Sequence, residues 1–392
     1  MAISDTGSAQ NMGRGLWSGL WSAIAVIAAF GLFAIFLRKA EGWWLAGIAV
    51  ACILAASWPQ ARALLQKFVA RLQQNSCAVA LAALVGAVLM PIFLENDGYW
   101  IHVLSAAMIF SIMAIGLNIH LGEIGLVNLG YAGLFAFGAY TATLMTEAGY
   151  PFWFGTVLAI LVCWIVGGLV GACSIRTTGD YFALVTLGFG LIVHQLIINL
   201  IWLTRGNDGI TNIKPVSIFG HTSKMPIDLG FLQLPAQANF YYLCLVSLIA
   251  AAFVARRYQV TWVGRMWTAL RQDNIGVASF GLNVPRFKVQ TVAFGSAFAG
   301  LAGSLFAHQI GFISPDDFTL LHSIEVLAAV ILGGMGNIVG AVIGGIILHV
   351  APEKLRFLGD YRLLIYGGML VVILIFRPLG LLPDPRRRYE KF

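Results

Sequence analysis

Long apolar runs are the feature that most constrains what this chain can fold into. An α-helix needs about 20 apolar residues to cross a bilayer. Such runs place predicted spans near residues 16–37, 43–58, 77–94, 100–121, 126–146, 152–174, 181–203, 239–255, 289–310 and 361–377. Charged residues make up only 10% of the chain, against about a quarter in soluble domains, so lipid must be its main solvent. The sequence therefore predicts an all-α, polytopic transmembrane helical bundle of about 10–12 spans, broken or half helices included.

One further apolar stretch, residues 323–351, is interrupted. The sequence Gly333-Gly334-Met335-Gly336-Asn337 divides it into halves that are each short for a full crossing. Two short spans and a re-entrant pair both fit this pattern, and both preserve the parity of the topology.

Lys and Arg predict the orientation, because cytosolic loops carry an excess of both. The loops 59–76 and 256–288 and the tail after residue 380 hold most of the basic residues, so all three are predicted to be cytosolic. Ser314–Asp317 is poor in basic residues and is placed on the opposite side, as is the segment 204–238. Both termini are then cytosolic, and Arg38-Lys39 is an exception to the bias.

Three parts are expected along the chain. Residues 1–75 form a helical hairpin with an amphipathic surface segment at 61–74. Residues 76–380 form the main transmembrane bundle, which includes the loop 256–288, and residues 381–392 form a basic cytosolic tail. No polar segment reaches the roughly 50 residues of a small soluble domain, so no nucleotide-binding domain is expected.

The loop 256–288 contains an amphipathic segment that begins after Gly264. Arg265, Arg271 and Asp273 are its polar residues, between apolar positions at helical spacing. The pattern predicts one short helix that ends at a C-cap glycine, Gly281. It is either a surface helix in the lipid headgroups or a docking helix that fits a groove on a cytosolic partner.

A second polar cluster lies among glycines in the segment 116–140. Asn118, His120, Glu123 and Asn128 sit there in an apolar setting. A backbone broken at membrane depth must be satisfied by protein or water, and such breaks often mark the solute path of a transporter. A tight cytosolic turn whose glycines only allow packing is the alternative.

The sequence lacks the motifs of several classes of function. The sequence has no G-x-x-x-x-G-K-[ST] phosphate loop, no H-E-x-x-H and no G-x-S-x-G. Its five cysteines lie in apolar runs without metal-ligand spacing, and they are interpreted as small hydrophobic residues. The basic residues form no stripe on one domain, which argues against nucleic acid as a partner. We therefore expect a transporter subunit with no cofactor, no metal site and no catalytic residue.

A series of segments in the main bundle resembles one family. The segments are Leu117–Tyr140, Gly179–Gly190, Thr204–Thr211, Ala269–Val284, Ser314–Phe318, Leu332–Gly336 and Phe376–Leu381. In this order they are similar to the signature segments of branched-chain amino acid ABC transporter permeases of the LivM type, in the LivHM permease family. His120 and Glu123 are more polar than that signature. The N-terminal hairpin resembles an extension found on some LivM-type permeases.

The resemblance implies an importer of leucine, isoleucine and valine in the bacterial inner membrane. A periplasmic solute-binding protein would deliver the solute, a second homologous permease would pair with this chain, and two ATPase subunits would drive the cycle. Coupling to an ATPase is expected at Arg271, Asp273, Ala278 and Gly281. The translocation path is expected at Asn118, Asn128, Tyr131, Thr186 and Glu325.

Alternatives stay open at this point. The same family includes urea and amide importers. An ion-coupled secondary transporter would need a buried acid in its path, for which Glu325 and Glu123 are the candidates. A membrane enzyme would require His194, His308 and an acid to converge in space.

Overall fold

The computed structural model describes residues 26–37, 76–95, 97–173, 175, 180–218, 221–222, 227–228 and 233–361, with scattered positions between 364 and 382. The expected span 43–58 and surface segment 61–74 lie outside these residues, as do most of the span 361–377 and of the tail. The described chain divides into two compact units, residues 1–101 with 227–238 and residues 102–226 with 239–392.

The all-α architecture is confirmed. Five helices are long and apolar enough to cross a membrane within the described residues: α5 (Gly98–Asn118) with its continuation η1 (Ile119–Ile124), α7 (Phe152–Cys173), α8 (Asp180–Asn199), α10 (Ala236–Val260) and α13 (Val284–Ile310). Shorter helices accompany them: Val26–Leu37, α4 (Ser76–Phe93), α6 (Tyr131–Glu147), α14 (Leu320–Gly333) and α15 (Ile338–Lys354).

In the first unit, the helix Val26–Leu37 packs closely on α4. Gly86 allows this approach, because a Cβ there would lie 2.7 Å from Cδ2 of Phe30. Two short strands, β4 (Ile227–Asp228) and β5 (Gln233–Leu234), pair in an antiparallel ladder.

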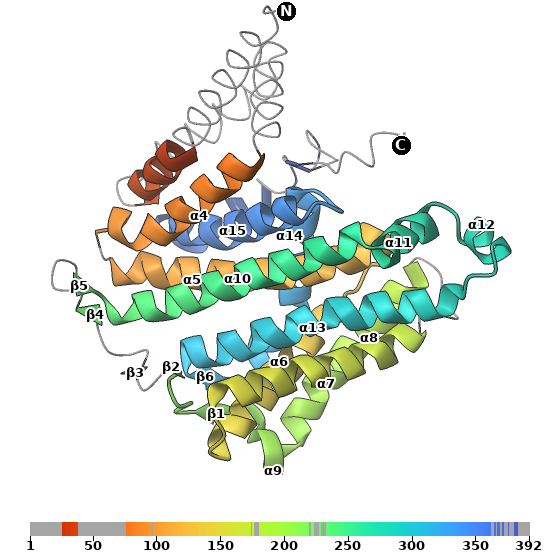
Figure 1. Ribbon diagram of the computed structural model, residues 1–392. Coiled ribbons are helices and arrows are strands. Elements are labelled where there is room, and N and C mark those ends of the chain that lie inside the picture. The colour runs from red at the N-terminus through yellow and green to blue at the C-terminus, as the bar shows by residue number, and fades with distance from the viewer. Residues whose placement is uncertain are drawn as a thin grey trace, which may run out of the picture. The chain divides into compact units, whose positions relative to one another are not determined.

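In the second unit, α13 lies against α6 and α7 (Figure 1). Most of α13 is buried, whereas only a minority of the residues in α7 and α8 are buried. Glycines let the backbones approach: a Cβ on Gly300 would lie 2.6 Å from the carbonyl oxygen of Ala159, and one on Gly138 would lie 2.7 Å from Cα of Gly300. Close approach through small residues is the usual way in which helices associate in lipid.

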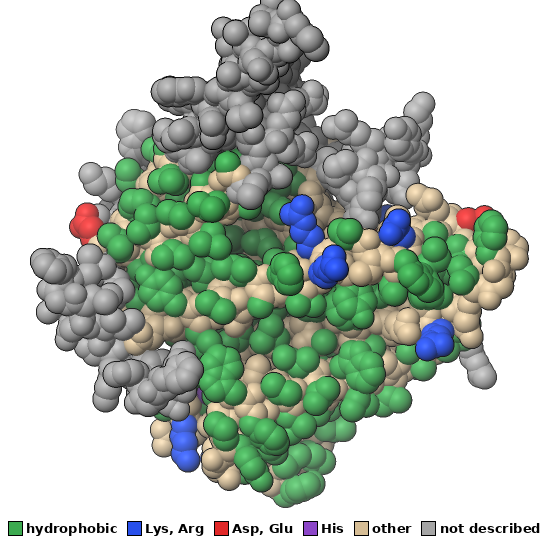
Figure 2. Space-filling model, viewed as in Figure 1, with side chains coloured by type: hydrophobic (Ala, Val, Ile, Leu, Met, Phe, Trp, Pro, Cys, Tyr) green, Lys and Arg blue, Asp and Glu red, His purple; other side chains and the backbone are tan. Residues whose placement is uncertain are grey.

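The exposed surface of these helices is apolar. Leu161, Trp164 and Leu169 on α7 and Leu184 and Ile192 on α8 are all more than one-third exposed. Figure 2 shows one face of the molecule, on which the described surface is largely apolar and charged side chains are few. A surface of this kind requires lipid or another apolar protein surface as its neighbour.

The remaining elements are short. They are α9 (Ile201–Thr204), η2 (Gly206–Asp208), α11 (Trp262–Gln272), α12 (Asn274–Ser279), η3 (Pro315–Phe318) and η4 (Leu355–Tyr361). Strands β1 (Ile210–Thr211) and β6 (Phe312–Ile313) form one antiparallel pair, and β2 (Ser217–Ile218) and β3 (His221–Thr222) form another.

The interrupted stretch 323–351 is an antiparallel hairpin of α14 and α15. Its turn uses Gly334 and Gly336 at positive φ, of 117° and 85°. Beside the turn, a Cβ on Gly340 would lie 2.5 Å from the carbonyl oxygen of Gly333. With 14 and 17 residues, the two helices are about 21 and 25 Å long, which is less than the ~30 Å of the hydrocarbon core.

Two sequence predictions need correction. The span predicted at 126–146 begins only at Tyr131, because a π-helical turn, η1, prolongs α5 to Ile124 and residues 125–130 are not helical. The single helix expected between Gly264 and Gly281 is two helices, α11 and α12, which separate at Asp273. The backbone of Asp273 is extended and its side chain caps the second helix, so the first cannot continue. Gly281 follows the end of α12 at a φ of 77°, as predicted for a terminating glycine.

Candidate functional site

The break between η1 and α6 is buried and satisfied by side chains. The amide of Leu129 donates to Oγ1 of Thr186 at 3.0 Å, and the amide of Gly130 donates to Oδ1 of Asn128 at 3.0 Å. The amide of Ala132, in the first turn of α6, donates to Oγ of Ser323 on α14 at 2.9 Å. Side chains thus replace the backbone bonds that the interrupted helix loses, as burial in protein or lipid requires.

The same region is tied to α13 and to the α14–α15 turn. The hydroxyl of Tyr131 donates to the carbonyl oxygen of Gly295 at 2.9 Å, and Nε2 of His120 lies 2.9 Å from the carbonyl oxygen of Val292. Oδ1 of Asn118 accepts the amide of Gly336 at 2.7 Å. The break is therefore a junction at which three parts of the second unit meet.

The residues predicted for the translocation path do not all lie together. Asn118, Asn128, Tyr131 and Thr186 are at most 1% exposed and belong to this junction. Glu325 is exposed on α14 and makes no part of it. The sequence therefore predicted where the helix is broken. Glu325, in contrast, is not among the residues that meet at the break.

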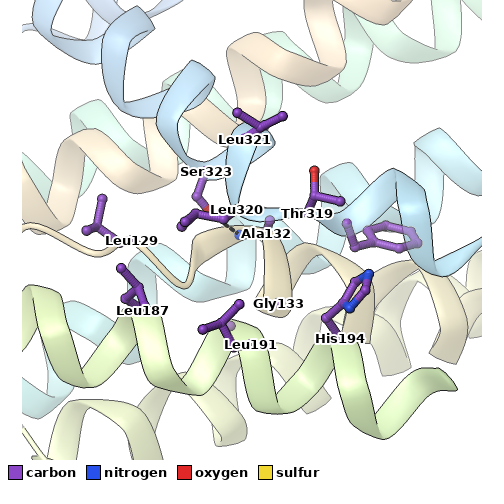
Figure 3. Close-up of a pocket in the computed structure, with 12 residues that line it drawn as sticks. Leu129, Ala132, Gly133, Leu187, Leu191, His194, Thr319, Leu320, Leu321 and Ser323 are labelled. Carbon is purple, nitrogen blue, oxygen red and sulfur yellow. Dashed lines mark hydrogen bonds between the residues drawn. The ribbon is translucent and has the colours of Figure 1, made fainter. Parts of the chain in front are cut away.

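A cavity of about 240 Å³ opens beside the break, between the start of α6, α8 and the segment 318–323 (Figure 3). It is lined by Leu129, Ala132, Gly133, Leu187, Gly190, Leu191, His194, Phe318, Thr319, Leu320, Leu321 and Ser323. Figure 3 shows Leu187, Leu191 and His194 on α8 facing the residues of the segment 319–323. The walls are mainly apolar, with five leucines, and His194, Thr319 and Ser323 are the polar side chains.

Sequence reasoning missed this cavity. None of the five predicted path residues lines it, although Leu129 and Ala132 adjoin Asn128 and Tyr131 in the chain. Its leucines look like ordinary membrane-facing residues in the sequence, and only the packing of α8 against α14 residues places them around a space. Nε2 of His194 is buried and has no hydrogen-bond partner within the described residues.

Helix α11, in the segment where coupling is predicted, contacts the same junction from its other end. Arg271 on α11 donates from one guanidinium nitrogen to the carbonyl oxygens of Leu121 and Gly122, at 3.1 and 2.8 Å. Thr268, one turn earlier, donates to a carboxyl oxygen of Glu123 at 2.9 Å. Beneath them, Trp267 is 1% exposed and its ring stacks on Tyr258 at 5.6 Å between centroids. Helix α11 is thus held to the bundle by an apolar face and by polar contacts to η1.

The predicted coupling residues have different places. Arg271 faces η1, and Asp273 accepts the amides of Ile275 and Gly276, both at 2.9 Å, as the N-cap of α12. Ala278 and Gly281 are exposed on the tip that α12 forms. Two apolar side chains on this tip, Ile275 and Phe280, are 83% and 85% exposed. The sequence did not reveal the exposure of Ile275, because it predicts one continuous helix and not a separate tip at this position.

Comparison with known proteins decides the family. The pattern of a family described as "Branched-chain amino acid transport system / permease component" matches residues 99–374, which is well over half of the chain. The chain belongs to this permease family. The matched residues include η1, the break, the coupling segment and the α14–α15 hairpin.

This permease is 39% identical over 318 residues to the high-affinity branched-chain amino acid transport system permease protein LivM of Escherichia coli strain K12, covering 78% of this chain and 74% of that one. It is 38% identical over 319 residues to LivM of Salmonella typhimurium strain LT2, covering 78% and 75%. The permease protein LivH of Escherichia coli strain K12 is 23% identical over 294 residues, covering 70% and 92%. No solved structure matches.

Membership of this family makes the permease a membrane-embedded transporter component. The possibility of a membrane enzyme had required His194 and His308 to converge with an acid. His308 is instead bonded to Oγ1 of Thr146 at 3.0 Å and to the carbonyl oxygen of Ser304 at 2.8 Å, whereas His194 lines the cavity.

Proposed function

We propose that the chain is the membrane-spanning permease subunit of an ABC importer that carries leucine, isoleucine and valine across the bacterial inner membrane. The similarity to LivM over most of the chain is the observation that carries this proposal. The leucine-lined cavity beside the helix break supports it, because an aliphatic side chain fits apolar walls. A urea or amide solute would need more polar partners than this cavity offers.

The partners follow from the same likeness. A second, homologous permease pairs with this chain as a heterodimer, and the match to LivH as well as LivM supports a pair of related permeases. Two ATPase subunits supply the energy, because the sequence has no phosphate loop of its own. A periplasmic binding protein meets the segments 204–238 and 311–322 and contributes to solute choice.

The ATPase docks on the tip formed by α12. Ile275 and Phe280 stand exposed there, and exposed apolar side chains on a short structured helix suit a groove on a partner. The charges of Arg256, Arg257 and Arg265 support a cytosolic position for this tip, and we propose that both termini lie on the same side. Closure of the ATPase pair then pushes α12 and α11 toward the bundle.

The push reaches the junction at the helix break. Asn118, Asn128, Tyr131 and Thr186 form the part of the path at this junction. Glu325, which lies on α14 outside the junction, borders the path that alternates between outward and inward access. A break in a helix can change its arrangement without disturbing the long helices around it, which suits it to a gate.

Uptake by reconstituted vesicles tests the proposal. The complete complex is placed in vesicles that enclose ATP, with the binding protein and labelled leucine outside. We expect uptake that requires hydrolysable ATP, survives an uncoupler, and is reduced by unlabelled isoleucine and valine but not by urea. Uptake without ATP that collapses with the uncoupler would instead show an ion-coupled transporter. Competition by urea or acetamide alone would overturn the choice of solute.

A further inference from the structure

Glu123 is a buried acid in the π-helical turn that ends α5. It is 2% exposed. Burial of a carboxyl group is costly unless hydrogen bonds replace the lost water. The free-energy cost of burying the Glu123 carboxyl group must therefore be offset by specific hydrogen-bond partners.

Both carboxyl oxygens of Glu123 have such partners, and each partner comes from another helix. Nε2 of Gln259, in the last turn of α10, donates to Oε1 at 2.6 Å. Oγ1 of Thr268, on α11, donates to Oε2 at 2.9 Å. The side chain of Glu123 thus joins the end of α5 to α10 and to α11.

The attachment extends to the α14–α15 turn. Nε2 of Gln259 also lies 3.2 Å from the carbonyl oxygen of Gly336, whose amide donates to Asn118 at 2.7 Å. Arg271 holds the carbonyl oxygens just before Glu123. A series of polar contacts therefore connects α11, through Glu123, with η1 and with the turn between α14 and α15.

We propose that Glu123 is the positioning residue that couples α11 to the broken helices, so that displacement of α11 moves η1 and the turn at Gly336 together. This rests on the proposed function, because it assumes that an ATPase displaces α11. Apolar contacts such as that of Trp267 allow one helix to slide on another. Hydrogen bonds join particular atoms and lose their strength when those atoms separate, so the polar contacts, and not the apolar face, transmit the movement.

The ratio of leucine transported to ATP hydrolysed, measured on the reconstituted complex, tests this role. Glu123→Leu keeps a side chain of similar size and removes both hydrogen bonds. We expect ATPase subunits to be recovered with the variant as with the wild type, and ATP hydrolysis to continue. The transported leucine per ATP should fall at least about fivefold, the lower end of typical coupling energies between sites.

Two further variants separate transmission from general damage. Thr268→Val removes one of the two hydrogen bonds and should lower the same ratio by less, whereas Glu123→Leu combined with Thr268→Val should be no worse than Glu123→Leu alone. Thr156→Val, which removes a buried hydroxyl bonded to Ser304 at 2.6 Å, is the control and should leave the ratio unchanged.

The outcomes are distinguishable. If the wild-type complex shows no ATP-driven uptake, the proposed function fails. If the wild type transports and Glu123→Leu keeps its leucine per ATP, the role of Glu123 is wrong while the function stands. If Glu123→Leu does not assemble, Thr268→Val decides, and an unchanged ratio in that variant overturns the role.

Discussion

At the scale of single residues, the bundle depends on positions where backbones touch. Gly300 on α13 is the clearest, because a Cβ there would lie 2.6 Å from the carbonyl oxygen of Ala159 and 3.0 Å from Cβ of Cys163. Neither neighbour can rotate away, since both belong to the helix backbone or stand directly on it. We expect Gly300→Ala to destabilise the protein by about 1–3 kcal/mol, measured by thermal unfolding in detergent.

Gly188 on α8 supplies the matched control for this substitution. It is also a helical glycine, but a Cβ there would meet nothing within 4 Å. Gly188→Ala should leave stability unchanged or raise it by roughly 0.5–1 kcal/mol, the gain in helix propensity. Equal effects of the two substitutions would show that glycine at 300 serves only the helix backbone and not the contact with α7.

At the scale of elements, α12 is a helix of six residues that a single cap maintains. Two amides in its first turn, those of Ile275 and Gly276, donate to Oδ1 of Asp273, so loss of that oxygen leaves them without this partner. We expect Asp273→Ala to cost about 0.5–2 kcal/mol locally and to unwind α12. The expected result is faster amide exchange at residues 274–279 and weaker recovery of ATPase subunits in a pull-down.

Asp273→Asn tests the cause of this effect. Asparagine keeps the capping oxygen and removes the charge, so it should retain both the helix and the partner. If Asp273→Asn loses the ATPase while α12 stays protected from exchange, the charge of Asp273 contacts the partner and the cap is incidental.

The sequence predicted the helices better than the junction that they form. The span predicted at 152–174 is observed as Phe152–Cys173, because continuous apolarity fixes a membrane helix almost alone. The start of α6 at Tyr131 could not be predicted in this way. It depends on Thr186 and Ser323, which reach the break from other helices and satisfy its amides. Neither partner is near the break in the sequence, so no local pattern reveals it.

The candidate site shows the same limit. Asn118 and Asn128 were selected because polar residues among glycines are unusual in an apolar setting, and both are buried at the break. Glu325 is a candidate for another reason, as an ionisable residue at the start of the broken segment 323–351, but its place on the exposed side of α14 depends on how the hairpin packs. The partners of Glu123, Gln259 and Thr268, are ordinary polar residues in the sequence and gain their role only through the fold of α10 and α11.

At the scale of the whole molecule, α13 determines which segments lie on opposite faces of the membrane. Its 27 residues make it about 40 Å long, more than the ~30 Å of the hydrocarbon core. The tip of α12 precedes it and η3 follows it, so these two segments must lie on opposite sides. Because basic residues flank α12, we predict that its tip is the segment on the cytosolic side.

Cysteine labelling checks this arrangement in a variant that lacks the native cysteines. Ile275 and Asp316 are both exposed, so Ile275→Cys and Asp316→Cys should react readily with a membrane-impermeant maleimide. We expect position 275 to react only in inside-out vesicles and position 316 only in right-side-out vesicles, with both reacting after detergent is added. Reaction of both from one side would contradict the crossing of α13. A reversed pattern would keep the crossing but place the coupling tip outside the cell, where no ATPase could reach it.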